Sequence, residues 1–135
     1  APPVTWPGRY EMRFVEGEWP DYRAGPRDQP ESRSVLWVRD HPPRPLDAPA
    51  LACLSDVFYP RIFRRRHRFT PAGTVSITTY FHAEAQALAA QGSRPVLAVA
   101  QGRRFAHGFF DQTAEVWSDD GHLLASSHQI VYFKE

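Results

Sequence analysis

Cysteine is nearly absent from this chain, which has a single one, Cys53, among 135 residues. One thiol cannot form a disulfide within the chain, so a small secreted scaffold held together by disulfides is excluded. Cys53 stands among apolar residues, where a lone cysteine is typical of a small buried side chain. We therefore expect a cytoplasmic protein with Cys53 in its core.

An excess of charge is also missing, because 16 basic residues balance 15 acidic ones and the formal net charge is +1. This balance gives no electrostatic reason to expect nucleic acid or an anionic membrane as the main partner. No apolar run approaches the roughly 20 residues that cross a bilayer, and the first residues lack the parts of a signal peptide. We expect a soluble chain. Position 1 is not methionine, so the chain is either processed or, as we expect, a piece of a longer protein.

The chain does have the length and composition of one compact domain over residues 1–135, with 42% hydrophobic residues. Ten of its 13 prolines precede position 50, so this first third is expected to consist of extended segments joined by stiff loops. Between those loops, residues 10–15 alternate bulky with charged positions, and residues 34–39 are rich in β-branched and aromatic side chains. Each segment predicts a strand.

A change of periodicity predicts one helix after the second strand. Asp47-Ala-Pro49 is typical of a cap and first turn, and apolar residues then recur at spacings of three and four from Leu51 to Ile62. The other positions are mostly small or apolar as well, which predicts a helix that the rest of the protein encloses. Pro60 is expected to end or kink it.

Strand periodicity returns at Thr74–Phe81, where one face is apolar and the other, beginning with Thr74, is mostly polar. Residues 83–92 predict a short helix or a loop. Three more strands are expected at Pro95–Phe105, Phe109–Trp117 and Leu123–Phe133, the last two joined by a turn that contains Asp-Gly. An antiparallel sheet with one largely apolar helix indicates an α+β arrangement in which the sheet curls around the helix, the hotdog fold.

Three polar residues interrupt these apolar patterns. Asp56 falls within the apolar helix, where an ionised carboxylate is costly unless it is paired, hydrogen-bonded or hydrated. Gln129 shares a strand face with apolar residues, so its amide needs partners there. Each residue could also have a purely structural role. The hydroxyl of Thr74 could close the turn that precedes it, and Asp56 could face solvent at the edge of the helix. In one small domain, however, the three side chains could converge on a water molecule.

Four stretches of the chain resemble the second, C-terminal hotdog domain of the type II acyl-CoA thioesterases. They are Arg33-Ser-Val-Leu-Trp-Val-Arg39, Leu51-Ala-Cys-Leu-Ser-Asp56, Gly73-Thr-Val-Ser-Ile-Thr-Thr-Tyr-Phe-His82 and Asp120-Gly-His-Leu-Leu-Ala-Ser-Ser-His-Gln129. The four stretches occur here in the order and at the spacing typical of that domain. The resemblance as a whole runs from about Tyr10 to Phe133, which is nearly the whole chain.

The resemblance implies a hydrolytic site in which an Asp, a Thr or Ser, and a Gln orient and activate the attacking water. These roles fall on Asp56, Thr74 and Gln129 of this chain. Just after Thr74, the chain has residues 76–78 as Ser-Ile-Thr where the family commonly has Asp-His-Ser, a difference that bears on substrate range. In this chemistry Asp56 would accept a proton or hold the water, Thr74 and Gln129 would fix its direction, and no acyl-enzyme is required.

The only dense basic run comprises Arg61, Arg64, Arg65, Arg66 and Arg68. At a helix end, such cations can simply complement the helix dipole. Alternatively Arg64, Arg65 and Arg66 bind the phosphates of coenzyme A, for which the guanidinium fork is suited. The sequence lacks a Gly-x-Ser-x-Gly elbow, a His-x-x-x-His pair, a cysteine cluster and a Gly-rich phosphate loop. We therefore expect neither a serine hydrolase of the α/β type nor a metal site.

We expect an acyl-CoA thioesterase with no cofactor, since coenzyme A is part of the substrate. Two alternatives stay open: a noncatalytic domain that binds acyl-CoA or completes an oligomer, and an enoyl-CoA hydratase, although the chain lacks the hydratase signature. Because a single curled sheet leaves exposed edges, we also expect a partner hotdog domain. This partner is either a second copy of the chain or an N-terminal half that precedes Ala1.

Overall fold

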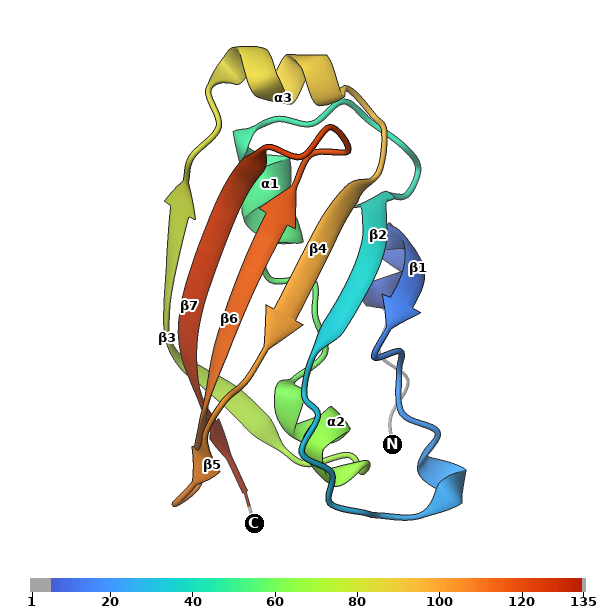
Figure 1. Ribbon diagram of the computed structural model, residues 1–135, viewed down its shortest axis with the longest axis vertical. Coiled ribbons are helices and arrows are strands. Elements are labelled where there is room, and N and C mark those ends of the chain that lie inside the picture. Colours follow the sequence, from blue (N-terminus) through green and yellow to red (C-terminus); the bar gives the residue numbers. More distant parts are fainter. Residues whose placement is uncertain (1–5, 135) are drawn as a thin grey trace.

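The computed structural model describes residues 6–134, and its centre is a curled sheet (Figure 1). The strands lie in the order β1-β2-β4-β6-β7-β3, and β5 adds a short ladder to β6. Their bounds are β1 Tyr10–Glu16, β2 Ser34–Asp40, β3 Ala72–Phe81, β4 Val96–Gln101, β5 Phe105–Ala106, β6 Phe109–Trp117 and β7 Leu123–Phe133. All pairings are antiparallel, as the strand pattern predicted.

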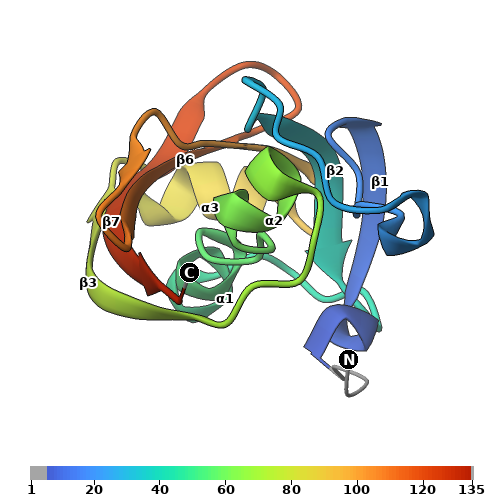
Figure 2. The ribbon, with the colours of Figure 1, turned by 90° about the horizontal axis from the view of Figure 1, so that it is seen from below.

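Short helices accompany the sheet. Their bounds are α1 Ala48–Leu54, α2 Arg61–Arg66 and α3 Ala85–Gln91, with 3-10 segments η1 Trp6–Arg9 and η2 Tyr22–Ala24. The sheet curves around α1 and α2, whereas α3 lies across the upper end of the molecule as drawn in Figure 1 (Figure 2). The predicted α+β arrangement, a sheet wrapped around a central helix, is confirmed. None of the helices in the described residues has the length and apolar character needed to span a membrane.

Helix α1 is shorter than the sequence predicted. Asp47 caps it as expected, but the helix ends at Leu54. The hydroxyl and backbone N–H of Ser55 both donate to the carbonyl of Leu51, at 2.8 and 3.0 Å, and the helical ladder ends after them, because the N–H of Asp56 bonds to the nearer carbonyl of Cys53. The chain then leaves the helix, and residues 57–59 are buried in an irregular connection to α2.

Only one side of α1 is covered. Ala50, Leu51 and Leu54 are buried against the sheet, whereas Ala52 and Cys53 are exposed. The prediction of an enclosed helix with a buried Cys53 is therefore wrong, because the described residues leave this side of the helix exposed.

The apolar core has two parts, one around α1 and one around α2. The part around α2 consists of Tyr59, Ile62, Phe63, Phe110, Val131 and Phe133. On β6, the buried Gln112 stands between Phe110 of this part and Ala114 of the part around α1. Its register partner on β7 is Gln129, which is also buried. A pair of polar side chains thus crosses the inward face of the sheet where the two apolar parts meet.

A fully buried arginine ties the connection before α2 to the sheet. Arg61 is 0% exposed and forms no ion pair with a carboxylate of the described residues. Its guanidinium instead donates to the carbonyl oxygens of Tyr59 (2.7 and 3.2 Å) and Ser32 (2.9 Å) and to the hydroxyl of Ser34 (2.7 Å). Burial lowers the pKa of Arg61 to about 10, so the side chain stays charged at neutral pH.

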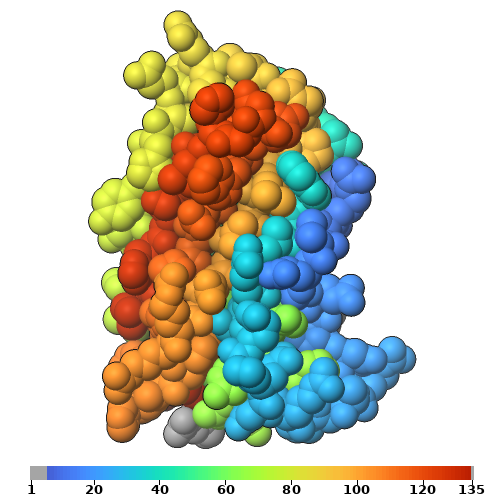
Figure 3. All heavy atoms as spheres, in the orientation of Figure 1, coloured from blue at the N-terminus to red at the C-terminus, as the bar shows by residue number. Residues whose placement is uncertain are grey.

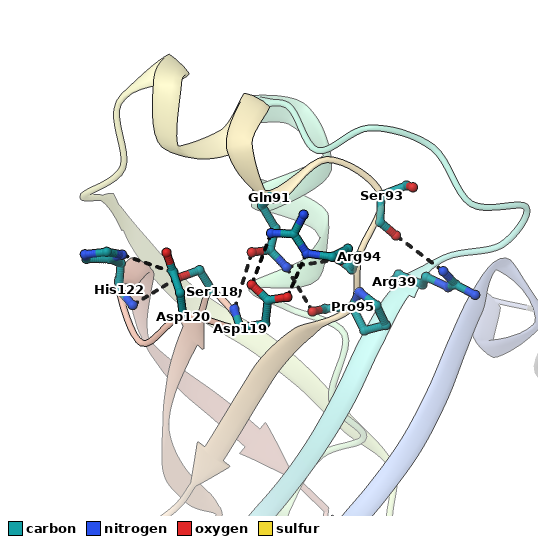
Figure 4. A network of polar contacts seen from close by, with 9 residues as sticks. All are labelled: Arg39, Gln91, Ser93, Arg94, Pro95, Ser118, Asp119, Asp120 and His122. Atoms are coloured by element: carbon teal, nitrogen blue, oxygen red, sulfur yellow. Dashed lines mark hydrogen bonds and ion pairs between the residues drawn. The ribbon is translucent and has the colours of Figure 1, made fainter.

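The end of the sheet opposite α2 is closed by polar contacts (Figure 4). Gln91, at the end of α3, donates to the carbonyl oxygens of Arg94 (3.2 Å) and Pro95 (3.0 Å) and accepts from the N–H of Asp119 (3.3 Å). Arg94 and Asp119 form an ion pair at 2.7 Å, and the hydrogen bond from Arg94 lowers the pKa of Asp119. These contacts fix α3 to the start of β4 and to the turn between β6 and β7.

Strand β3 forms one edge of the sheet and is exposed along its length. The space-filling view shows it along one side of the molecule, beside β7 (Figure 3). Its large exposed side chains are Val75, Ile77, Tyr80 and Phe81, with exposed fractions between 42% and 61%. A long apolar edge of this kind is a template for pairing with another chain or domain.

Replacing Arg61 by Met is expected to lower the free energy of unfolding by about 2–4 kcal/mol, because carbonyl oxygens of Ser32 and Tyr59 lose their buried donor. Urea unfolding followed by tryptophan fluorescence measures this change. The matched control is Arg13→Met at an exposed position of β1, which should change the free energy by less than about 0.5 kcal/mol. Equally small effects of both substitutions would contradict the role given to Arg61.

Candidate active site

Asp56, Thr74 and Gln129 meet on the inward face of the sheet. Gln129 lies between the other two: its Nε2 donates to Oδ1 of Asp56 at 3.0 Å, and its Oε1 accepts from the hydroxyl of Thr74 at 3.1 Å. An ionised carboxylate can only accept, so these contacts fix which way the amide points. The structure brings all three residues that the sequence singled out into one hydrogen-bonded chain.

Asp56 lies in the turn after α1 and not within a buried helix as the sequence predicted. The residue is exposed, and its N–H donates to the carbonyl of Cys53 at 3.1 Å as part of the closing turn. Gln129 holds Oδ1, whereas Oδ2 accepts no hydrogen bond from the described residues. The carboxylate therefore contacts solvent and keeps one oxygen available for a water molecule or a substrate.

Thr74 reaches the inward face because β3 is irregular. Thr74 pairs with Val131 and Ser76 pairs with Ile130, so Val75 is an extra residue in the ladder. Strict alternation would put Thr74 and Ser76 on the same face. With Val75 as the extra residue, Thr74 shares the inward face of Val131, and Ser76 shares the outward face. The predicted polar face that grouped Thr74 with Ser76 is therefore wrong.

Gln112 on β6 also belongs to this site, although it was not among the residues predicted from the sequence. It pairs in register with Gln129 and is 3% exposed. Its Oε1 accepts from the backbone N–H of Arg61 at 3.3 Å. The signal was present in the sequence, because Gln112 stands on an apolar strand face with Phe110 and Ala114, just as Gln129 interrupts the inward face of β7.

The four polar residues line a pocket of about 220 Å³. Its other walls are Trp6, Phe58, Pro60, Ala72, Gly73 and Val131. The rings of Tyr10 and Trp19 hold Trp6 in place, with centroid distances of 6.4 and 6.1 Å. Apolar walls with a few polar groups are typical of a small-molecule site, although this volume is below the roughly 300 Å³ at which drug-sized ligands are usually enclosed.

Arg64, Arg65 and Arg66 do not line this pocket. Successive residues of an α-helix point about 100° apart, so three consecutive arginines cannot face one ligand together. Arg66 lines a separate hollow of about 440 Å³ with Arg27 and Arg68. The predicted contact of these arginines with phosphates stays a prediction.

The chemistry that this site allows is proton transfer and hydrogen bonding to a small polar group. Asp56 can accept a proton, and Thr74, having donated its only hydroxyl proton to Gln129, presents an oxygen that can accept a hydrogen bond. Gln112 presents amide N–H groups that can donate. No three His, Cys, Asp or Glu side chains lie close enough together to hold a metal ion in the part of the chain that the structure describes.

Known structures resemble this chain over nearly its whole length. A conserved protein of unknown function with a hot dog fold from Alicyclobacillus acidocaldarius is 43% identical, with a TM-score of 0.88 over 100% of this chain and 49% of that chain. The TesB protein of Mycobacterium avium subspecies paratuberculosis is 18% identical, with a TM-score of 0.71 over 100% of this chain and 54% of its own. An acyl-CoA thioesterase II of Mycobacterium marinum is 15% identical, with a TM-score of 0.57 and coverages of 94% and 49%.

The chain spans about half the length of these solved structures. No curated protein is similar enough to count as a match. The two thioesterase-related structures are distant in sequence and show the hotdog fold alone. The family described as acyl-CoA thioesterase C-terminal domain, in contrast, matches residues 1–133. Because this match covers nearly every residue, the chain belongs to the acyl-CoA thioesterase C-terminal domain family.

Proposed function

We propose that this domain hydrolyses the thioester of an acyl-CoA to a free acid and coenzyme A, using a water molecule activated by Asp56. The observation that carries the proposal is the hydrogen-bonded chain from Thr74 through Gln129 to Asp56, which lines one pocket. Membership of the acyl-CoA thioesterase C-terminal domain family supports the choice of substrate class.

Asp56 is the general base of this proposal. Its Oδ2 accepts a proton from water, and the resulting hydroxide oxygen attacks the carbonyl carbon of the thioester. The π electrons of the carbonyl move to its oxygen and then re-form the double bond as the C–S bond breaks. The coenzyme A thiolate leaves and takes up the proton from Asp56, which restores the carboxylate.

Thr74 and Gln129 orient the reacting groups. Gln129 donates to Oδ1, which fixes the carboxylate plane and directs Oδ2 to the water. Thr74 uses its proton on Gln129, so its oxygen can accept the second hydrogen of the water and hold the attacking lone pair toward the carbonyl. The amide between them keeps both acceptors at fixed positions before the substrate arrives.

The pocket is too small for a whole acyl-CoA. Its volume of about 220 Å³ accommodates the thioester and the first acyl carbons. We assign the phosphates of coenzyme A to Arg66, the one member of the run Arg64–Arg66 that lines the hollow, together with Arg27 and Arg68 and beside Asp28. The arginines of this run lie in the short helix α2, which begins directly after Pro60, a wall residue of the pocket.

The rest of the substrate is then enclosed by a partner hotdog domain. The unpaired edge of β3 and the exposed side of α1, with Ala52 and Cys53, are the two apolar surfaces that the partner would cover. Either a second copy of this chain or another half of a longer protein fills this place, and a natural chain about twice as long would agree with the solved structures.

The substitution Asp56→Asn is expected to lower the turnover of acyl-CoA by about a hundredfold or more, because asparagine keeps an acceptor for Gln129 but cannot take the proton. Free-thiol release from acetyl-, octanoyl- and palmitoyl-CoA by the natural full-length protein measures the effect. The matched control is Glu115→Gln, at an exposed position of β6, which should leave turnover unchanged. Binding of acyl-CoA without thiol release by the unchanged protein would instead establish a noncatalytic binding domain.

The partner surface is tested by a pair of isoleucines in neighbouring strands. Ile77 on β3 is 42% exposed and pairs with the inward-facing Gln129, whereas Ile130 on β7 is 38% exposed and faces outward. In the natural full-length protein, Ile77→Lys should lower the free energy of unfolding by about 1–3 kcal/mol, because the partner buries the new charge. Ile130→Lys should stay within about 0.5 kcal/mol. Equal changes in urea unfolding would contradict a partner on the β3 edge.

A further inference from the structure

The side-chain amide of Gln112 has only one possible orientation. Its Oε1 accepts from the backbone N–H of Arg61 at 3.3 Å, and a backbone N–H cannot accept in return. The carbonyl of the amide therefore faces the N–H of Arg61, and both protons of Nε2 stay available for other acceptors. Arg61 is itself fully buried and held by Tyr59, Ser32 and Ser34, so the reference point for this orientation is rigid.

The Nε2 group of Gln112 has no acceptor in the described part of the chain, and because it is not one of the fully buried atoms that lack a partner, it keeps some contact with solvent. Gln112 lines the pocket that also contains Asp56, Thr74 and Gln129. A donor that meets only solvent can be offered to a ligand without breaking a hydrogen bond within the protein. A molecule that enters the pocket with an accepting oxygen would satisfy it.

The neighbours of Gln112 supply the opposite kind of group. One proton of the Nε2 group of Gln129 is donated to Asp56, and the hydroxyl proton of Thr74 is donated to Gln129. Toward the pocket, Asp56 and Thr74 therefore present oxygens that accept, while Gln112 presents N–H groups that donate. Because Gln112 and Gln129 are register partners, the Cβ atoms of this pair are about 5 Å apart. Acceptors for a water molecule and a donor for a carbonyl thus stand next to each other.

We propose that Gln112 is a further catalytic residue, whose Nε2–H donates to the carbonyl oxygen of the thioester. This inference rests on the proposed function. When the water oxygen bonds to the carbonyl carbon and its proton passes to Asp56, the π electrons collect on the carbonyl oxygen, and the hydrogen bond from Gln112 strengthens. When the C–S bond breaks, the electrons return to the carbonyl and the thiolate takes up the proton from Asp56.

Two substitutions separate this role from a purely structural one. Gln112→Glu keeps an oxygen for the N–H of Arg61 but removes the donor, whereas Gln112→Met removes both groups at similar volume. If Gln112 only holds Arg61, then Gln112→Glu retains activity and Gln112→Met loses it. If Gln112 donates to the carbonyl, then both variants lose kcat by about a hundredfold or more. Thr113→Val, at the next position of β6, is the matched control and should keep kcat within threefold.

A second readout observes the hydrogen bond directly. An acyl-CoA labelled with ¹³C at the thioester carbonyl is bound to the full-length Asp56→Asn protein, which turns it over slowly, and the carbonyl stretch is recorded by infrared spectroscopy. We expect the carbonyl stretch of the bound compound to lie at lower frequency than that of the same labelled acyl-CoA free in solution. This shift should disappear when Gln112→Met is added. A shift that persists would overturn the donor role.

The outcomes distinguish this inference from the function on which it rests. Acyl-CoA hydrolysis that depends on Asp56 but keeps kcat within threefold in Gln112→Glu overturns the role of Gln112 and leaves the thioesterase proposal standing. No hydrolysis of any acyl-CoA by the unchanged full-length protein overturns both. Loss of kcat in both Gln112 variants, together with loss of the infrared shift, supports the assignment.

Discussion

Two glutamine side chains buried on the apolar inward face of the sheet constrain the rest of this structure. An amide in such a place must find hydrogen-bond partners, and the sheet itself offers few. Gln129 finds Asp56 and Thr74, and Gln112 finds the N–H of Arg61. Asp56 and Arg61 mark the two ends of the connection between α1 and α2. The same bonds therefore anchor this connection across the sheet and separate the two parts of the apolar core.

This constraint also determines which groups of the site donate hydrogen bonds and which accept them. Because each amide is used on one side by a partner of known hydrogen-bonding type, the remaining groups have defined roles toward the pocket: acceptors at Asp56 and Thr74, and a donor at Gln112. Such a preorganised mixture suits the addition of water to a carbonyl, which needs a proton acceptor and a stabiliser of negative charge at once. The small pocket and the bare edge of β3 are consistent with a site that a second domain completes.

Periodicity predicted the strands, the antiparallel sheet and the central helix, because these depend on which faces are apolar. It placed Asp56 wrongly, because the helical ladder ends after Ser55, where the N–H of Asp56 bonds to the carbonyl of Cys53, and apolar spacing does not record such a local turn. It placed Thr74 on the wrong face, because the extra residue Val75 leaves no mark in an alternating pattern. Despite these errors, the three residues that the family resemblance singled out lie in one hydrogen-bonded chain, and their catalytic roles stay a prediction. Gln112 interrupts an apolar face of β6 just as Gln129 interrupts an apolar face of β7. The pattern that indicated Gln129 would therefore also have indicated Gln112.

The central claim is that water activated at this site attacks the thioester without a covalent intermediate. A single turnover of octanoyl-CoA by an excess of the full-length protein in ¹⁸O-labelled water tests it most directly, with the released acid and the protein analysed by mass spectrometry. The account predicts that the first octanoic acid formed carries one ¹⁸O atom and that Asp56 carries none. Unlabelled acid in the first turnover, with ¹⁸O appearing in the carboxylate of Asp56, would show attack by the protein itself and contradict the account.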